Sequence, residues 1–144
     1  MPVWIKAGVD DYLRRLPREI NCTLSELKPD TRTGMAIAQR LATEAARIEA
    51  ALPAGALRVV LDERGSMLTT LQLAEKFERW MQDGRDVAFV IGSADGLDAS
   101  LKKKAELQLA LSAFTLPHAL ARVVLVEQLY RVFSLLKNHP YHRE

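Results

Sequence analysis

The chain has 144 residues, 49% of them hydrophobic and 26% charged, which is typical of one globular domain with a buried core. The net charge of +2 is too small for a general polyanion binder, and no apolar run is long enough for a membrane span. The first residues lack the sections of a signal peptide. Cys22 is the only cysteine, which excludes an intrachain disulfide and fits a cytoplasmic protein.

The first half of the sequence predicts two helices and a weak strand. Apolar residues recur at helical spacing from Ile5 to Leu16, and Pro17 ends this run. The segment 21–27 (NCTLSEL) alternates weakly and indicates a short strand. A second helix is expected over residues 35–52, where one apolar stripe is sustained.

The second half predicts strands that alternate with helices. Short β-branched or alternating runs predict strands over residues 57–62, 86–92 and 107–112, and ERGSM (63–67) is expected to form a loop. A helix capped by Thr69 or Thr70 is expected to end at Gly84, and a short helix follows the second of these strands. The last helix is expected over residues 117–137, with Thr115 as a candidate cap.

This alternation predicts an α/β fold with an open, mostly parallel sheet and helices on both faces. Neither an internal repeat nor a linker is visible, so we expect residues 1–144 to form a single domain.

The last predicted helix is apolar nearly all round, which is expected of a helix buried on more than one side. In a domain of this size, one of these sides is expected to meet a second subunit. We therefore predict a homodimer with a two-fold axis. The alternative is a central helix that is wholly covered within one chain.

Loops that follow the strands of an open α/β sheet are the usual ligand sites. Here these loops carry LDERG (61–65), IGSADGL (91–97) and LSAFTLPH (111–118), and we expect them to form one pocket. The glycine-bearing turn 92–96 is neither a P-loop nor a Rossmann fingerprint, and it is either a close approach to a ligand or a plain tight turn. His118, in the first turn of a helix, is a candidate proton acceptor or a packing residue.

Other chemistry has less support in the sequence. The order of residues supports no set of Ser, His and acid, and Cys22 has no histidine near it in the sequence. His118, His139 and His142 are possible zinc ligands, but the last two flank Pro140 and Tyr141 in a tail, and no cysteine pair supports them. We therefore expect no metal site.

The segments LDERG, IGSADGL, TLPH, LYR and NHPYHRE, together with the early YLRRLP, resemble one family over nearly the whole chain, from Trp4 to Glu144. They are similar to the RlmH-type methyltransferases of bacterial large-subunit ribosomal RNA, which belong to the SPOUT or α/β-knot class. The resemblance implies a C-terminal trefoil knot, a homodimer with its active site at the subunit interface, and S-adenosylmethionine as cofactor. By matching, the cofactor would be held mainly by the backbone of Leu61, Gly92, Leu111, Ser112, Ala113, Phe114, Thr115 and Leu116.

The resemblance also implies a reaction, namely methylation of N3 of a pseudouridine in a stem-loop of the large-subunit RNA in the assembled ribosome. Alignment of nitrogen and methyl group would supply much of the rate, and a nearby cation would stabilise the imide anion. RNA phosphates are expected to meet Arg14, Arg15, Arg18 and the run 102–104. The candidate catalytic residues are His118, favoured as the proton acceptor, and Arg131, Tyr141, His142 and Arg143.

The sequence departs from the family pattern at two places. Members usually carry a first β-strand before the segment that matches residues 1–16, and this chain starts after it. The family's Gly-Gly-Pro-Glu-Gly loop reads GSADG here, so the Cβ of Ser93 is expected to weaken cofactor binding. These departures leave one alternative function open, a non-catalytic RNA- or ribosome-binding module that retains the fold.

Overall fold

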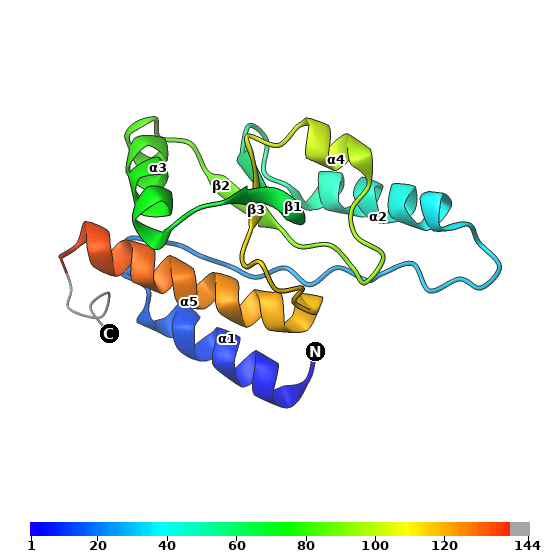
Figure 1. The fold of residues 1–144 in the computed structure, drawn as a ribbon, viewed down its shortest axis with the longest axis horizontal. Helices are drawn as coiled ribbons and strands as arrows, with labels where there is room; N and C mark the ends of the chain where they lie inside the picture. Colours follow the sequence, from blue (N-terminus) through cyan, green and yellow to red (C-terminus); the bar gives the residue numbers. More distant parts are fainter. Residues whose placement is uncertain (139–144) are drawn as a thin grey trace.

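The computed structural model describes residues 1–138, in which helices and strands alternate after the first two helices (Figure 1). Its elements are α1 (Val3–Arg15), α2 (Ile37–Ala51), β1 (Leu57–Met67), α3 (Thr70–Gln82), β2 (Val87–Val90), α4 (Ala99–Lys103), β3 (Leu107–Ala110) and α5 (His118–Leu136).

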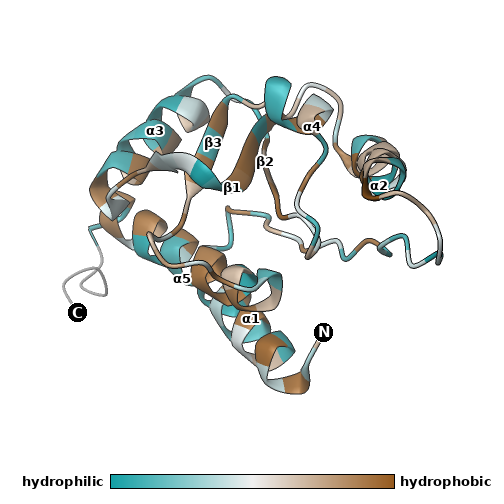
Figure 2. Cartoon of the chain, turned by 45° about the vertical axis from the view of Figure 1, so that its right-hand side comes forward, coloured by the Kyte–Doolittle hydropathy of each residue, from teal (hydrophilic) through white to brown (hydrophobic). Residues whose placement is uncertain are grey.

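The described residues contain a three-stranded parallel sheet with the order β2-β1-β3. Val60 in the central strand lies opposite Val90 of β2 and Gln108 of β3. Helices α1 and α5 run side by side along one side of the sheet, whereas α2 and α4 lie on the opposite side of the molecule (Figures 1 and 2). The predicted α/β fold with a parallel sheet is therefore confirmed.

Helix α5 is the centre of the hydrophobic core, and it is buried on two sides within one chain. Its inner side carries Phe133, whose ring meets the edge of Phe77 from α3 at 5.3 Å between ring centroids. The adjacent side carries Val123, which packs against the cluster of Ile5, Val9 and Val126 between α1 and α5. A stripe on the remaining side stays half-buried, and it contains Leu120, Val124, Glu127, Gln128, Arg131 and Leu135. 

Membrane insertion of α5 is not supported by its composition. None of the helices within residues 1–138 combines the length and the apolar character needed to cross a bilayer.

Helix α3 follows its sequence signals closely. The hydroxyl of Thr69 accepts a hydrogen bond from the backbone N–H of Gln72 (3.1 Å), and the Gln72 side chain accepts one from the N–H of Thr69 (2.9 Å). This capping box fixes the start of the helix. Gly84 has φ +67° just beyond the end, which only glycine adopts readily. The prediction for this helix is confirmed at both ends.

The strand expected over residues 21–27 is not present, so that prediction was wrong. Residues 20–32 have no regular secondary structure and form no backbone ladder with β1, β2 or β3. Ile20 and Cys22 pack against the main core, while Leu24 remains exposed. Because a strand requires a neighbour to hydrogen-bond with, weak alternation alone did not determine the structure here.

The first strand of the sheet is longer than expected, and the loop predicted at residues 63–67 is wrong. β1 continues to Met67, and both Leu61 and Ser66 lie opposite Leu109, so the residues between them form a bulge. A Cβ on Gly65 would lie only 2.5 Å from the carbonyl oxygen of Gln108. Glycine thus lets the strand resume its pairing with β3 after the bulge.

The position of Phe133 yields a stability prediction. Phe133→Ala should lower the free energy of unfolding by about 3–5 kcal/mol, because the side chain is buried between α5 and α3. Urea denaturation followed by circular dichroism measures this. Leu71→Ala on α3, the helix that Phe133 packs against, is the control and should cost clearly less, since Leu71 is 58% exposed. Equal losses for the two variants would contradict this description of the core.

Candidate functional site

Three loops meet at one edge of the sheet. They are the bulge 62–65 in β1, the turn 92–97 after β2 and the segment 111–117 before α5. Because the three strands are parallel and adjacent, the bulge of β1 lies level with the carboxyl ends of β2 and β3, which is the usual place for ligand sites in such sheets. The structure therefore brings together the eight positions expected to hold a cofactor. Their binding role remains a prediction.

The β1 bulge is held by a carboxylate. Asp62 accepts a hydrogen bond from the N–H of Arg64 (3.1 Å) and pairs with the ammonium group of Lys102 on α4 (3.1 Å). Burial disfavours the charged form of Asp62, but these two donors outweigh that effect and hold the pKa of the carboxyl below its usual value. The bulge thus presents an ionised carboxylate next to Leu61.

The turn after β2 is compact. The N–H of Gly96 donates to the carbonyl of Ser93 (2.9 Å), and Gly96 has φ +93°, which favours glycine. A Cβ on Gly92 would lie 2.6 Å from the carbonyl oxygen of Gly96. The close approach at Gly92 is therefore made within the turn itself, and any change of residue there would shift the turn.

The segment before α5 is ordered by the hydroxyl of Ser112, which accepts a hydrogen bond from the N–H of Phe114 (2.9 Å). This bond turns the Phe114 side chain outward, where it is 82% exposed. The expectation that Thr115 caps α5 is wrong. Pro117 holds the N-cap position without a side-chain bond, and the Thr115 hydroxyl instead reaches Glu63 at 3.4 Å.

The two candidate catalytic residues that the structure describes, His118 and Arg131, lie far apart within one chain. His118 is exposed in the first turn of α5, next to the three loops. Arg131 lies thirteen residues further on, about 20 Å along the helix axis, where its Nε donates to Glu127 at 2.9 Å. Tyr141, His142 and Arg143 lie outside the described residues and follow the far end of α5.

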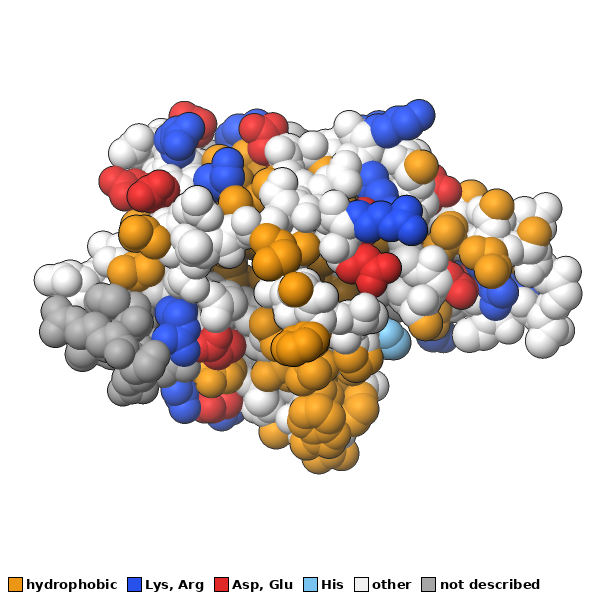
Figure 3. All heavy atoms as spheres, in the orientation of Figure 1, with side chains coloured by type: hydrophobic (Ala, Val, Ile, Leu, Met, Phe, Trp, Pro, Cys, Tyr) orange, Lys and Arg blue, Asp and Glu red, His pale blue; other side chains and the backbone are white. Residues whose placement is uncertain are grey.

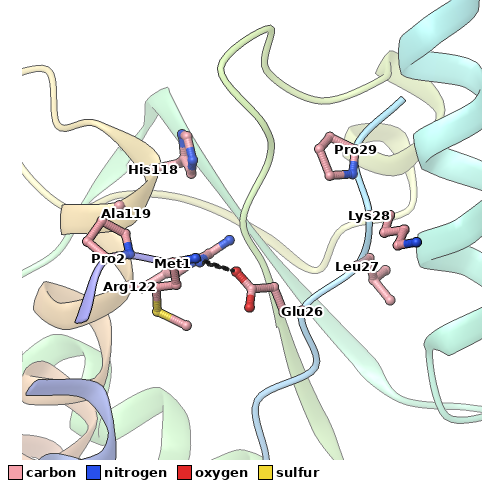
Figure 4. Close-up of a pocket in the computed structure, with 9 residues that line it drawn as sticks. All are labelled: Met1, Pro2, Glu26, Leu27, Lys28, Pro29, His118, Ala119 and Arg122. Carbon is pink, nitrogen blue, oxygen red and sulfur yellow. Dashed lines mark hydrogen bonds and ion pairs between the residues drawn. The ribbon is translucent and has the colours of Figure 1, made fainter. Parts of the chain in front are cut away.

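A cavity of about 450 Å³ lies beside His118, between the start of the chain, segment 26–29 and α5 (Figure 4). Glu26 on its wall pairs with Arg122 at 2.9 Å. None of the eight predicted cofactor positions lines this cavity. We therefore take the three loops, and not this cavity, as the candidate site, because ligands of parallel sheets bind at the strand ends.

The basic residues expected to contact RNA phosphates are partly engaged elsewhere. Arg15 pairs with Asp11 at 2.9 Å, and Lys102 is bound to Asp62. The end of α1 and helix α4 also lie on different sides of the molecule, so their basic residues form two separate groups (Figure 1). Phosphate contacts by these residues remain a prediction.

Two other kinds of chemistry gain no support from the described part of the chain. Burial raises the pKa of the Cys22 thiol, which keeps it protonated at neutral pH and a weak nucleophile. Within residues 1–138 no group of three His, Cys, Asp or Glu side chains is placed to hold a metal ion, and His139 and His142 lie outside that range.

Sequence reasoning missed two polar contacts that shape the loops. The pair Asp62–Lys102 joins residues forty positions apart, and the hydroxyl of Ser93 donates to Glu44 on α2 at 3.0 Å. Glu44 lies off the apolar stripe of its helix, where a carboxylate is normally only solvated. Position in the sequence gave no sign of either partner.

Comparison with known proteins gives a consistent result. A family model described as "Predicted SPOUT methyltransferase" matches residues 1–142. The chain is 54% identical over 143 residues to a protein of Dechloromonas aromatica and 56% identical over 144 residues to one of Burkholderia vietnamiensis. Both relatives are named "Ribosomal RNA large subunit methyltransferase H", and each match covers 99% of this chain and 92% of the relative. The chain therefore belongs to the SPOUT methyltransferase family.

Proposed function

We propose that this protein transfers a methyl group from S-adenosylmethionine to N3 of a pseudouridine in the large-subunit ribosomal RNA. It acts in the cytoplasm, as a homodimer, on the assembled ribosome. The observation that carries this proposal is the match of more than half of all residues to relatives whose names specify methylation of large-subunit ribosomal RNA. The donor, the target atom and the trefoil knot follow from the resemblance of the segments TLPH, LYR and NHPYHRE.

The residues at the three loops suit this cofactor. Leu61, Leu111 and Leu116 are half-buried apolar side chains at the strand ends, which suit an adenine ring and a methionine chain. The exposed Glu63 places a carboxylate beside them, which complements a sulfonium, whereas the charge of Asp62 is already balanced by Lys102. When bound, S-adenosylmethionine supplies a methyl group on a positively charged sulfur atom.

The protein's own side chains have two tasks in this proposal. The imidazole of His118 accepts the proton from N3 of the base, and it is exposed beside the loops for this purpose. A guanidinium, from Arg131 or Arg143, stabilises the negative charge that develops on the imide. Tyr141 and His142 orient the base. Alignment of N3 with the methyl group then accounts for much of the rate.

The length of α5 supports a site built from two subunits. The helix runs nineteen residues, about 28 Å, from the loops at its start to Arg131 and the tail near its end. Within the described residues, one chain therefore holds the cofactor loops and Arg131 far apart along the helix. If two α5 helices pack antiparallel about a two-fold axis, each tail reaches the loops of the other subunit.

A surface suited to such a dimer is present. The half-buried stripe of α5 offers Leu120 and Val124, and nearby Trp4 is 66% exposed. Figure 3 shows hydrophobic side chains gathered over the start of α1 and the loop before α5. An exposed apolar patch of this kind is typical of an interface. Phe133 does not belong to this patch, because it lies in the core of one chain.

The activity is tested with ribosomes from a strain that lacks the modification. Calorimetry should show S-adenosylmethionine binding, and mass mapping should show one added methyl group at the target pseudouridine. The control is ribosomes that already carry the modification, which should accept no methyl group. Cofactor binding without transfer would contradict the enzymatic proposal, and ribosome binding indifferent to the cofactor would favour the non-catalytic module.

A site shared between subunits is tested by mixing two inactive variants. His118→Ala and a variant lacking residues 141–144 should each form inactive dimers. After unfolding and joint refolding, random pairing should restore about a quarter of the wild-type sites, because half of the dimers then contain one intact site. Each variant refolded alone is the control. Absence of rescue, with mixed dimers shown by mass spectrometry, would place the tail and His118 in the same subunit's site.

The proposed dimer interface is tested by introducing a charged side chain on the half-buried stripe of α5. Val124→Asp should convert the dimer to a monomer in light scattering, because an unpaired carboxylate cannot be buried between subunits at low cost. Ile37→Asp is the matched control, since Ile37 is exposed on α2 on the other side of the molecule. A Val124→Asp protein that keeps the dimer mass would show that this stripe is not the interface.

A further inference from the structure

One carboxylate joins three separate parts of the chain. Glu44 lies on α2, and its Oε1 accepts a hydrogen bond from the hydroxyl of Ser93 at 3.0 Å. Its other oxygen, Oε2, accepts one from the backbone N–H of Asp30 at 3.0 Å. The side chain therefore connects α2 both to the turn after β2 and to the extended segment that precedes the helix.

Helix α2 is attached to the molecule mainly by polar contacts. Ala45 is its one buried residue, so little apolar packing fixes its position. Glu49 forms two bonds of 2.7 Å with the guanidinium of Arg58 on β1, and Arg47 donates to the carbonyl of Lys28 at 2.7 Å. Bonds that involve an ionised group are directional and stronger than neutral ones. The Glu49–Arg58 pair, which joins α2 to β1, thus places the Glu44 carboxylate relative to the sheet, whereas the Arg47 bond joins α2 only to the segment that contains Lys28.

The turn that receives this bond is compact enough to transmit a displacement. Gly92 and Gly96 touch through their backbones, and the Gly96 N–H is bonded to the Ser93 carbonyl. A shift of Ser93 would therefore move Gly92 with it. The Ser93 hydroxyl is turned towards α2, which assigns it a partner that its position in the loop did not suggest.

We propose that Glu44 is a positioning residue for the cofactor site, and that it acts through the Ser93 hydroxyl on the turn that contains Gly92. This inference rests on the proposed function, because it takes Gly92 as a cofactor contact. It also reverses the effect that the sequence predicted for Ser93 on cofactor binding. The serine strengthens cofactor binding by fixing the turn, instead of weakening it by crowding.

Calorimetry with S-adenosylmethionine distinguishes the two effects of Ser93. Ser93→Ala keeps the Cβ and removes the hydroxyl, so it should raise the cofactor Kd about 5- to 10-fold, as expected when one ordinary hydrogen bond no longer fixes the turn. If the Cβ of Ser93 weakened cofactor binding by crowding, Ser93→Ala would bind the cofactor like the wild type and Ser93→Gly would bind it more tightly. Either of these two results would overturn the proposal.

Further variants separate positioning from general loosening of α2. Glu44→Ala should raise the Kd at least as much as Ser93→Ala, and the double variant should be no weaker than Glu44→Ala alone, because both remove one interaction. Glu44→Gln should recover part of the affinity, since its amide offers both an acceptor and a donor. Arg47→Ala is the matched control. It removes another bond of α2, to Lys28, and should leave the Kd unchanged.

Hydrogen exchange adds a readout that needs no ligand. The amides of residues 92–97 should exchange faster in Ser93→Ala and Glu44→Ala, but not in Arg47→Ala. Equal cofactor affinities in the wild type, Ser93→Ala and Glu44→Ala would overturn this inference alone. A wild-type protein that binds no S-adenosylmethionine would overturn the proposed function, and this inference with it.

Discussion

Burial of α5 is the constraint on which the rest of the structure depends. The helix is apolar on nearly every side, and within one chain it packs against the sheet and α3 on one side and against α1 on another. Its first residue follows directly from the loop after β3, so the same packing that forms the core also fixes one wall of the candidate site. Its last turn lies at the opposite end of the helix from that wall. This rigid element therefore fixes the separation between the loops and Arg131, and that separation is the physical reason for proposing a site made by two subunits.

The candidate site combines rigid and polar supports. Its loops are anchored to parallel strands in the core, but their detailed positions depend on hydrogen bonds and ion pairs to the surrounding helices. Lys102 on α4 holds the bulge of β1 through Asp62, and Glu44 on α2 reaches the turn after β2 through Ser93. These contacts explain how loops with small, chemically quiet residues can keep a defined shape. In our proposal the loops bind the cofactor mainly through their backbone. The supporting side chains therefore contribute by holding the backbone of the loops in the shape that binds the cofactor.

Much of this fold was predictable where local signals and burial agree. Three sequence signals specify local structure that the core also favours: the capping box at Thr69, Gly84 beyond α3, and the β-branched runs of the sheet.

The errors of prediction arose where the local structure depends on a partner that is distant in the sequence. Residues 21–27 alternate weakly but pair with none of the three strands, and Gly65 lets β1 resume its ladder only because Gln108 lies opposite. The side-chain bonds of Glu44 and Asp62 could not be predicted from the sequence either, because both link residues that are distant in the sequence. The resemblance located the loops, and the predicted helix over residues 117–137 already separated His118 from Arg131, as the structure shows.

The central claim is that the tail of one subunit meets the cofactor loops of the other. Electron-spin distance measurements test it most directly, with one spin label at Ala113 and one at Glu144, in a background where Cys22 is replaced by serine. Dimers assembled from two singly labelled proteins report the distance between subunits, and doubly labelled chains diluted with unlabelled protein report the distance within one chain. The account predicts that the distance between subunits is the shorter of the two. A shorter distance within a single chain would contradict it.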